Sequence, residues 1–119
     1  MSAAEHFERL AQRLRNETPA YILAELNDLL TAASASQIGS LSEPSIADPY
    51  LANYVAAMVE QAAHLAGTQP PLWTSRVTPL AQPVFVTPWL ALRTHLLLES
   101  PVPFRRRNIF IDASIGDRV

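Results

Sequence analysis

The stretch "DPYLANYVAAMVEQAAHLAG", residues 48–67, has the clearest helical period in the chain. Its apolar residues recur at intervals of three and four, so they share one face of an α-helix. Asp48 can cap the first turn, and Pro49 suits the first helical position, where an N–H would have no partner. Gly67 is typical of the residue that follows a helix. The pattern predicts a helix from Pro49 to about Ala66 whose inward stripe is Leu51, Tyr54, Val55, Met58, Ala62 and Leu65.

Two amphipathic segments precede this helix. Residues 3–15 place Phe7, Leu10 and Leu14 on one stripe, which predicts a first helix. Thr18-Pro19 repeats the cap-and-proline start, and residues 19–33 predict a second, more apolar helix. Its buried stripe is expected to be Ile22, Leu23, Leu26, Leu29 and Leu30. The small polar residues 34–47 predict a loop, with one short helical turn as an alternative.

Proline changes the character of the second half of the chain. Residues 68–87 are both apolar and proline-rich, so they predict an extended wrap packed over the helices rather than a regular helix or a central strand. The wrap carries Leu72, Trp73, Val77, Leu80, Val84 and Phe85. Residues 88–99 predict a last helix with Trp89, Leu92 and Leu96 inward, and Leu97 as a further candidate for the inward face. Residues 100–119 are expected to form a C-terminal arm or short strand that contains the arginines.

These elements predict a mostly α fold: residues 1–119 as one small domain of about four helices, with a helical part over residues 1–67. The chain is 49% hydrophobic and 17% charged, which is enough apolar material for a core. Its net charge of -2 counts against a nucleic-acid binder that uses its whole surface. No apolar run is long enough for a membrane span and no signal peptide is visible, so the expected location is the cytoplasm.

Residues that commonly carry catalysis are scattered. The absence of cysteine excludes a disulfide framework, a thiolate zinc site and a cysteine nucleophile. His6, His64 and His95 lack metal-ligand spacing, and the three glycines are too isolated for a phosphate-binding loop. The serines lack a nucleophile-elbow pattern. The sequence therefore predicts a protein that is not an enzyme and needs no metal or cofactor.

The arginine run in "FRRRNIFID", residues 104–112, is the main candidate site. In an extended chain Arg105 and Arg107 would point one way and Arg106 the other. Three interpretations remain open. The arm docks on its own domain and its arginines pair with Glu99, Asp112 and Asp117; or it binds a partner protein, as a strand or an arm; or it grips phosphates. Ile109, Phe110 and Ile111 favour a short strand, which could pair with an edge of its own fold or of a partner.

From Asp48 onward the chain resembles a widespread family of small bacterial proteins. In that family a helix is followed by a P-x-W segment, a linker, a helix containing L-R and a closing "SP-x-x-FRRRN-[IV]-F-[IV]-D" signature. The matching residues here are Pro71, Trp73, Leu92, Arg93, Ser100, Pro101 and Phe104 through Asp112. Such proteins often look like the first member of a two-gene module whose second member is a nucleotidyltransferase-like toxin. The resemblance implies an antitoxin.

The functional expectation is thus a non-enzymatic antitoxin-like protein that binds a cognate toxin. Phe104 and Phe110 would be apolar anchors, and Arg105 to Arg107 would meet carboxylates that the toxin uses for metal and nucleotide. The predicted partner-binding residues are Phe104, Arg105, Arg106, Arg107, Asn108, Phe110, Trp73 and Trp89. A homo-oligomer is a further expectation. The alternatives are a nucleic-acid-binding regulator and a structural subunit; residues 1–47 lack a clear recognition helix, which counts against the regulator.

Overall fold

The computed structural model describes residues 2–86, 96–97 and 99–112, and most of these residues are helical. This confirms the mostly α fold. The helices are α1 (Ala3–Arg13), α2 (Pro19–Ala32), α3 (Ala35–Gly39), α4 (Pro49–Leu65), the 3₁₀ helix η1 (Leu72–Arg76) and α6 (Val102–Arg105), and the strands are β1 (Val84–Phe85) and β2 (Ile109–Phe110). Of the described helices, none has the length and apolar character that crossing a membrane requires.

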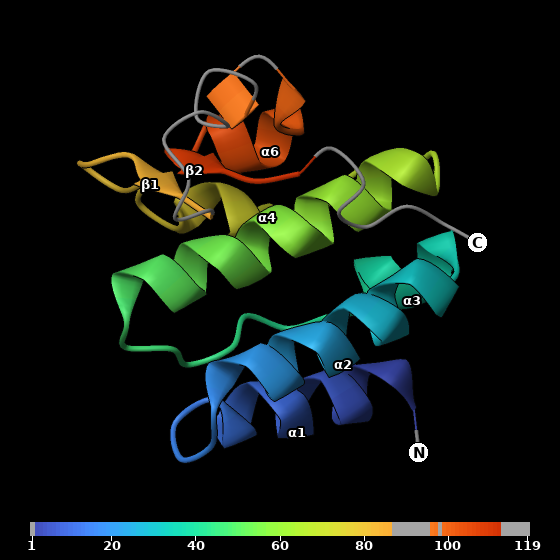
Figure 1. Cartoon of the computed structure of the whole chain (residues 1–119). Coiled ribbons are helices and arrows are strands. Elements are labelled where there is room, and N and C mark those ends of the chain that lie inside the picture. The colour runs from blue at the N-terminus through green and yellow to red at the C-terminus, as the bar shows by residue number, and fades with distance from the viewer. Residues whose placement is uncertain (1, 87–95, 98, 113–119) are drawn as a thin grey trace.

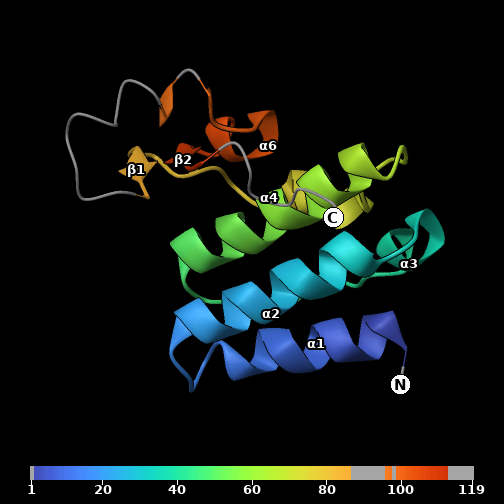
Figure 2. The same cartoon turned by 45° about the vertical axis from the view of Figure 1, so that its right-hand side comes forward.

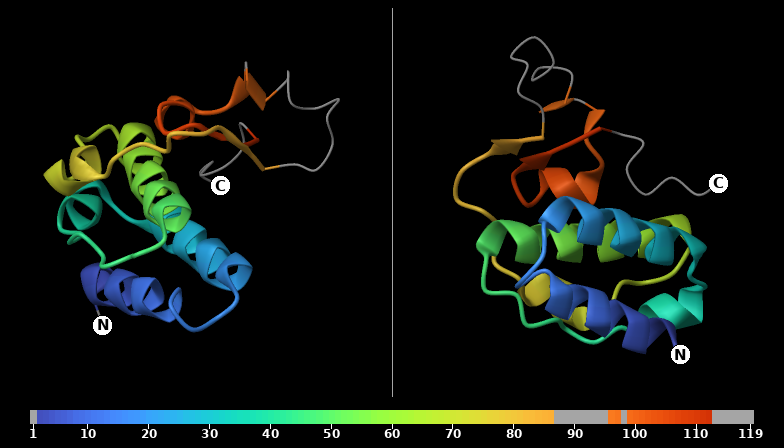
Figure 3. Two further views of the ribbon diagram at one scale, coloured as in Figure 1. Left: turned by 90° about the vertical axis from the view of Figure 1, so that its left-hand side faces the viewer. Right: turned by 60° about the horizontal axis from the view of Figure 1, so that its bottom comes forward.

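The three long helices are stacked in layers. α1 packs on α2 and α2 packs on α4, while the short helix α3 packs against α4 near the end of the stack (Figures 1 and 2). α6 and the two short strands lie on the side of α4 away from α1, as the two further views show (Figure 3). α4 is therefore the central element, with helices on one side and the C-terminal part of the described chain on the other.

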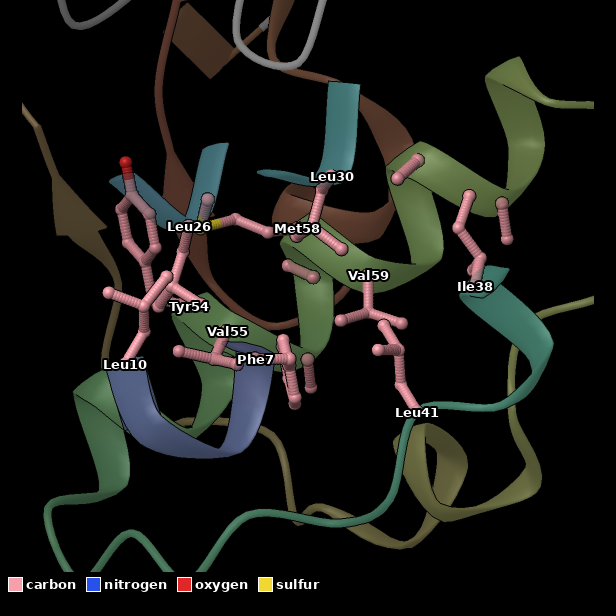
Figure 4. Close-up of a cluster of buried hydrophobic side chains, with 14 of the residues drawn as sticks. Phe7, Leu10, Leu26, Leu30, Ile38, Leu41, Tyr54, Val55, Met58 and Val59 are labelled. Atoms are coloured by element: carbon pink, nitrogen blue, oxygen red, sulfur yellow. The ribbon is translucent and has the colours of Figure 1, made fainter. Parts of the chain in front are cut away.

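The core is centred on α4. Its residues 53–59 are all buried, which a helix with a single inward face would not allow. Phe7 and Leu10 of α1, Leu26 and Leu30 of α2, and Ile38 and Leu41 around α3 converge on Tyr54, Val55, Met58 and Val59 (Figure 4). The predicted stripe is correct for its middle members, whereas Leu51 is half-buried and Leu65 is 39% exposed. The two end members of the predicted stripe are not fully buried, because the neighbouring layers cover only the middle of the helix.

The helix ends mostly follow the expected chemistry. One carboxylate oxygen of Asp48 accepts hydrogen bonds from the N–H groups of Tyr50, at 2.8 Å, and Leu51, at 3.1 Å. Gly67 has φ +72°, and the N–H of Thr68 donates to the carbonyl of Ala63, which closes α4 with a Schellman motif. At α2, by contrast, Pro19 takes the first turn but the side chain of Thr18 makes no capping hydrogen bond.

The proline-rich wrap is only partly extended. Residues 72–76 form the 3₁₀ helix η1, and β1 pairs in parallel with β2, with Val84 opposite Ile109 and Phe85 opposite Phe110. The strand of the arginine arm therefore pairs with an edge of its own fold. Leu72, expected to pack inward, is 83% exposed because η1 turns Trp73 and Thr74 to the interior instead. Most of the helix predicted over residues 88–99 lies outside the described residues. Leu96 and Leu97 are helical; Leu96 is buried as expected, whereas Leu97 is exposed.

Candidate functional site

The arginine run does not form the extended arm that the sequence predicts. Residues 102–105 form the single turn α6, with Pro103 in its first turn, and residues 106–108 complete a compact reversal into β2. Phe104 is fully buried and Arg107 is 5% exposed, whereas Arg105 and Arg106 are exposed. Helical spacing places Phe104 and Arg107, three residues apart, on the inward face. The prediction that Arg105 and Arg107 share a direction is therefore wrong.

Arg107 is bonded entirely to its own chain. Its Nε donates to Oε1 of Glu60 at 3.0 Å, and Nη2 lies 3.0 Å from the same oxygen. Nη1 donates to Oδ1 of Asn53 at 3.0 Å and to the carbonyl of Val77 at 3.1 Å, and Nη2 also donates to the carbonyl of Thr74 at 2.6 Å. One guanidinium thus joins α4 to the η1 region. Its acidic partner is Glu60, which the sequence analysis did not single out.

Three other predicted contact residues also serve the fold. Phe104 makes an edge-to-face contact with Tyr54, with ring centroids 5.4 Å apart, and Phe110 stacks on Phe85 at 5.0 Å. Asn108 has φ +63°, and its side-chain amide donates to the carbonyl of Leu80 at 2.6 Å. The expectation that Phe104 and Phe110 are exposed anchors for a partner is wrong, because the chain's own core covers both.

Of the two tryptophans predicted to contact a partner, only Trp73 lies among the described residues. Trp73 is buried, its ring centroid lies 6.4 Å from that of Phe7, and its Nε1 donates to the carbonyl of Leu41 at 2.9 Å. Trp73 therefore joins η1 to the helical stack and is not a surface contact residue. Trp89 lies outside the described residues.

Arg105 and Arg106 remain as the exposed part of the predicted site. Within the described part of the chain, neither side chain forms an ion pair. Their backbone is nevertheless well fixed, because the N–H groups of both residues donate to carbonyls of the α6 turn or of Pro101 before it. Two consecutive exposed cations are thus carried by a short, anchored turn.

Arg106 lines a groove of about 900 Å³. Its walls come from the second half of α4, from η1 with the residues leading into it, and from α6 with the residues before it. The lining residues are Glu60, Gln61, His64, Thr68, Gln69, Pro70, Pro71, Leu72, Thr74, Ser75, Glu99, Pro101, Val102, Pro103 and Arg106. Arg107 does not line the groove itself, but it donates hydrogen bonds to Glu60 on α4 and to Thr74 on η1. It therefore holds two of the three walls together.

The groove combines apolar surface with a few charges. Leu72 and Val102, 83% and 49% exposed, stand on η1 and α6, the two walls contributed by the second half of the chain. Glu60 is neutralised by Arg107, which leaves Glu99 and Arg106 as the charges without a partner among the described residues that line it. Glu60, His64 and Glu99 share this lining, but the described residues hold no group of three side chains placed to bind a metal ion.

One sequence signal could have located the Arg107 network. Asn53 stands among apolar residues in the most periodic part of α4, and a buried amide there requires polar partners. It finds them in Arg107 and in the carbonyls of Pro49 and Thr78, each 2.9 Å from its Nδ2. The exposure of Leu72 and Val102 carried no such signal, since their residue type alone favours burial.

Comparisons of the chain with protein-family models, with curated proteins and with solved structures found no match in any of the three.

Proposed function

We propose that this chain is a non-enzymatic binding protein that neutralises or regulates a cognate bacterial toxin of the nucleotidyltransferase type. The proposal combines two supports. One is the resemblance of residues 48–112 to antitoxin-like proteins. The other is the pair of exposed arginines, Arg105 and Arg106, which have no ion-pair partner in the described part of the chain.

The arginine pair carries the proposal because its backbone is preorganised. Phe104 on one side and Arg107 on the other are buried, so the backbone between them is held in place before any partner binds. A fixed backbone reduces the conformational entropy that binding costs, and an arginine guanidinium can hold a carboxylate through two parallel hydrogen bonds. Nucleotidyl transfer uses carboxylates to hold metal ions, so such a toxin would present acidic groups that suit this surface.

The mechanism that follows is occlusion of the toxin's acidic site. Arg105 and Arg106 would contact its carboxylates, while Leu72 and Val102 of the groove supply apolar contact. This mechanism is narrower than the one expected from the sequence, because Phe104, Arg107 and Phe110 already serve the chain's own core.

A pull-down from the native host tests the proposal. The tagged chain would be recovered at moderate salt after nuclease treatment, and its partners identified by mass spectrometry. We expect one stoichiometric protein that carries a nucleotidyltransferase carboxylate set and stops growth when produced alone. Recovery of nucleic acid, or of a protein that nuclease treatment releases, would instead indicate a nucleic-acid-binding regulator.

Paired variants show whether the arginines form the contact. Arg105→Ala/Arg106→Ala should lose the partner and leave the fold intact, since both side chains are exposed. Arg9→Ala is the matched control, because Arg9 is exposed on α1, on the other side of the helical stack (Figure 1). Retention of the partner by the double variant would contradict the proposed contact.

A further inference from the structure

The segment from Glu99 to Arg106 has an unusual pattern of exposure. Ser100 and Phe104 are buried: the hydroxyl of Ser100 accepts a hydrogen bond from the N–H of Ile111 at 2.8 Å, and Phe104 packs on Tyr54. These two anchors leave Glu99, Val102, Arg105 and Arg106 exposed. All of these except Arg105 line the groove. On the groove side the segment therefore presents an acid, an apolar residue and a base in order along the chain.

The order of charges is self-complementary. When two copies of the segment run in opposite directions, the acid of each copy faces the base of the other. Pro101, Val102 and Pro103 separate the acid from the base and line the same groove. In the described part of the chain neither Glu99 nor Arg106 forms an ion pair, with the other or with any other residue. A two-fold axis makes each residue of an interface contact the equivalent surface of the second copy, so a closed dimer needs a self-complementary patch.

We propose that the groove receives a second copy of this chain, with residues 99–106 of the two copies antiparallel about a two-fold axis. An axis between Val102 and Pro103 places Glu99 of each copy opposite Arg106 of the other. Val102 then lies against Pro103 of the second copy, in the apolar middle of the patch.

The apolar side chains provide a reason for this contact to form. Leu72 projects from η1 with 83% of its surface exposed, and the groove volume of about 900 Å³ is large enough to receive such a side chain from the second copy. Burial of Leu72 and Val102 drives association, whereas ion pairs at the rim contribute little affinity and mainly set the register. Arg107 fixes the groove walls in each copy by its bonds to Glu60 and Thr74.

The inference rests on the same surface as the proposed function and adds a form of regulation to it. Self-association and toxin binding both use Arg106 and the groove, so each would exclude the other. The test of self-association nevertheless needs only the purified chain, which keeps the two proposals separable.

Sedimentation velocity over a concentration series, at low and at high salt, tests the dimer. We expect the wild-type chain to dimerise. Arg106→Glu and Glu99→Arg should each weaken the dimer at least about tenfold, because each puts like charges opposite one another. An equimolar mixture of these two variants should dimerise again, since both cross-pairs then join opposite charges. Arg9→Glu and Glu8→Arg, which make the same charge changes at exposed sites on α1, should dimerise as the wild type does.

A wild-type chain that stays monomeric at all attainable concentrations would overturn the inference. So would equal association of the single variants and the wild type, or a mixture that associates no better than its components. Leu72→Glu gives a second test, since this exposed residue can change without loss of the fold, and the variant should be monomeric. A chain that stays monomeric and still captures its toxin would refute the dimer alone. A chain that dimerises, but captures no toxin at concentrations low enough to keep it monomeric, would count against the proposed function alone.

Discussion

Arg107 and Glu60 form a largely buried ion pair between two parts of the chain that are far apart in sequence. Nε and Nη2 of the guanidinium lie 3.0 Å from the same carboxylate oxygen. The remaining donors of Arg107 bind Asn53 and two backbone carbonyls. Because each donor has an acceptor, the cost of burying the charge is offset, and the second half of the chain is fastened to α4.

Removal of this arginine should be strongly destabilising. Arg107→Ala would leave Glu60 without its counter-charge and the carbonyls of Thr74 and Val77 without donors, so we expect a loss of about 3–5 kcal/mol in the free energy of unfolding. Arg107→Lys retains the charge but lacks the planar fork, and should lose part of that amount. Urea denaturation measures both losses. Arg106→Ala, at the exposed neighbouring position, should change stability by no more than about 0.5 kcal/mol; similar losses at both positions would contradict the assignment.

Trp73 provides a separate test of the contact between η1 and the helical stack. Trp73→Phe keeps a ring near Phe7 but leaves the Leu41 carbonyl without its donor, so it should cost about 1–3 kcal/mol. Trp73→Ala also removes the ring and should cost about 3–5 kcal/mol. Thermal unfolding followed by circular dichroism would rank the variants. Equal stability of Trp73→Phe and the wild type would show that the Nε1 hydrogen bond does not contribute.

Asn108 should be sensitive to backbone conformation. Its φ of +63° suits glycine or asparagine, whereas a residue with a larger or branched side chain is strained there. Both Asn108→Gly and Asn108→Ala lose the hydrogen bond to the Leu80 carbonyl, but only alanine adds backbone strain. The free energy of unfolding of Asn108→Ala should therefore be about 1 kcal/mol lower than that of Asn108→Gly, and Asn108→Ala should unfold at a lower urea concentration. The reverse order would contradict a left-handed conformation at this position.

Alkaline pH should destabilise the fold through Tyr54. Burial raises the pKa of Tyr54 to about 12, and the neighbouring Tyr50 adds to the shift. The folded protein thus holds this proton more tightly than the unfolded chain, where tyrosine titrates near pH ~10. Its stabilising contribution is complete below that pH and is lost as the pH rises towards about 12. Urea denaturation across this range should show a falling free energy of unfolding, and the decline should be smaller for Tyr54→Phe. Identical declines would exclude Tyr54 as the cause.

The long helices could be predicted because their determinants are local. Periodic apolar residues in α1, α2 and α4, together with Asp48, Pro49 and Gly67, specify where the helices form and where α4 begins and ends. These signals do not specify which part of each helix the neighbouring elements cover. Leu65 has the right spacing to be buried, yet it extends past the neighbouring helices and is exposed.

The candidate site was harder to predict because it depends on contacts between distant residues. Three consecutive arginines suggest one common role, but α6 turns Arg105 and Arg106 outward and Arg107 inward. Pro103 offered a local hint of this turn, because proline is favoured in the first turn of a helix. Nothing local relates Arg107 to Glu60, 47 residues earlier. The groove depends on the same long-range packing.

The bonds of Arg107 also have a consequence for how the protein is made. Asn53 precedes Arg107 by 54 residues, so α4 leaves the ribosome well before its buried amide and carboxylate can find their cationic partner. Until then the nascent helix carries polar groups that its apolar neighbours cannot satisfy. The first helices can associate during synthesis, but the hydrogen bonds of Arg107 can form only after that residue has been made. Contacts of such long sequence separation slow folding and prolong the interval in which chaperones find exposed apolar surface.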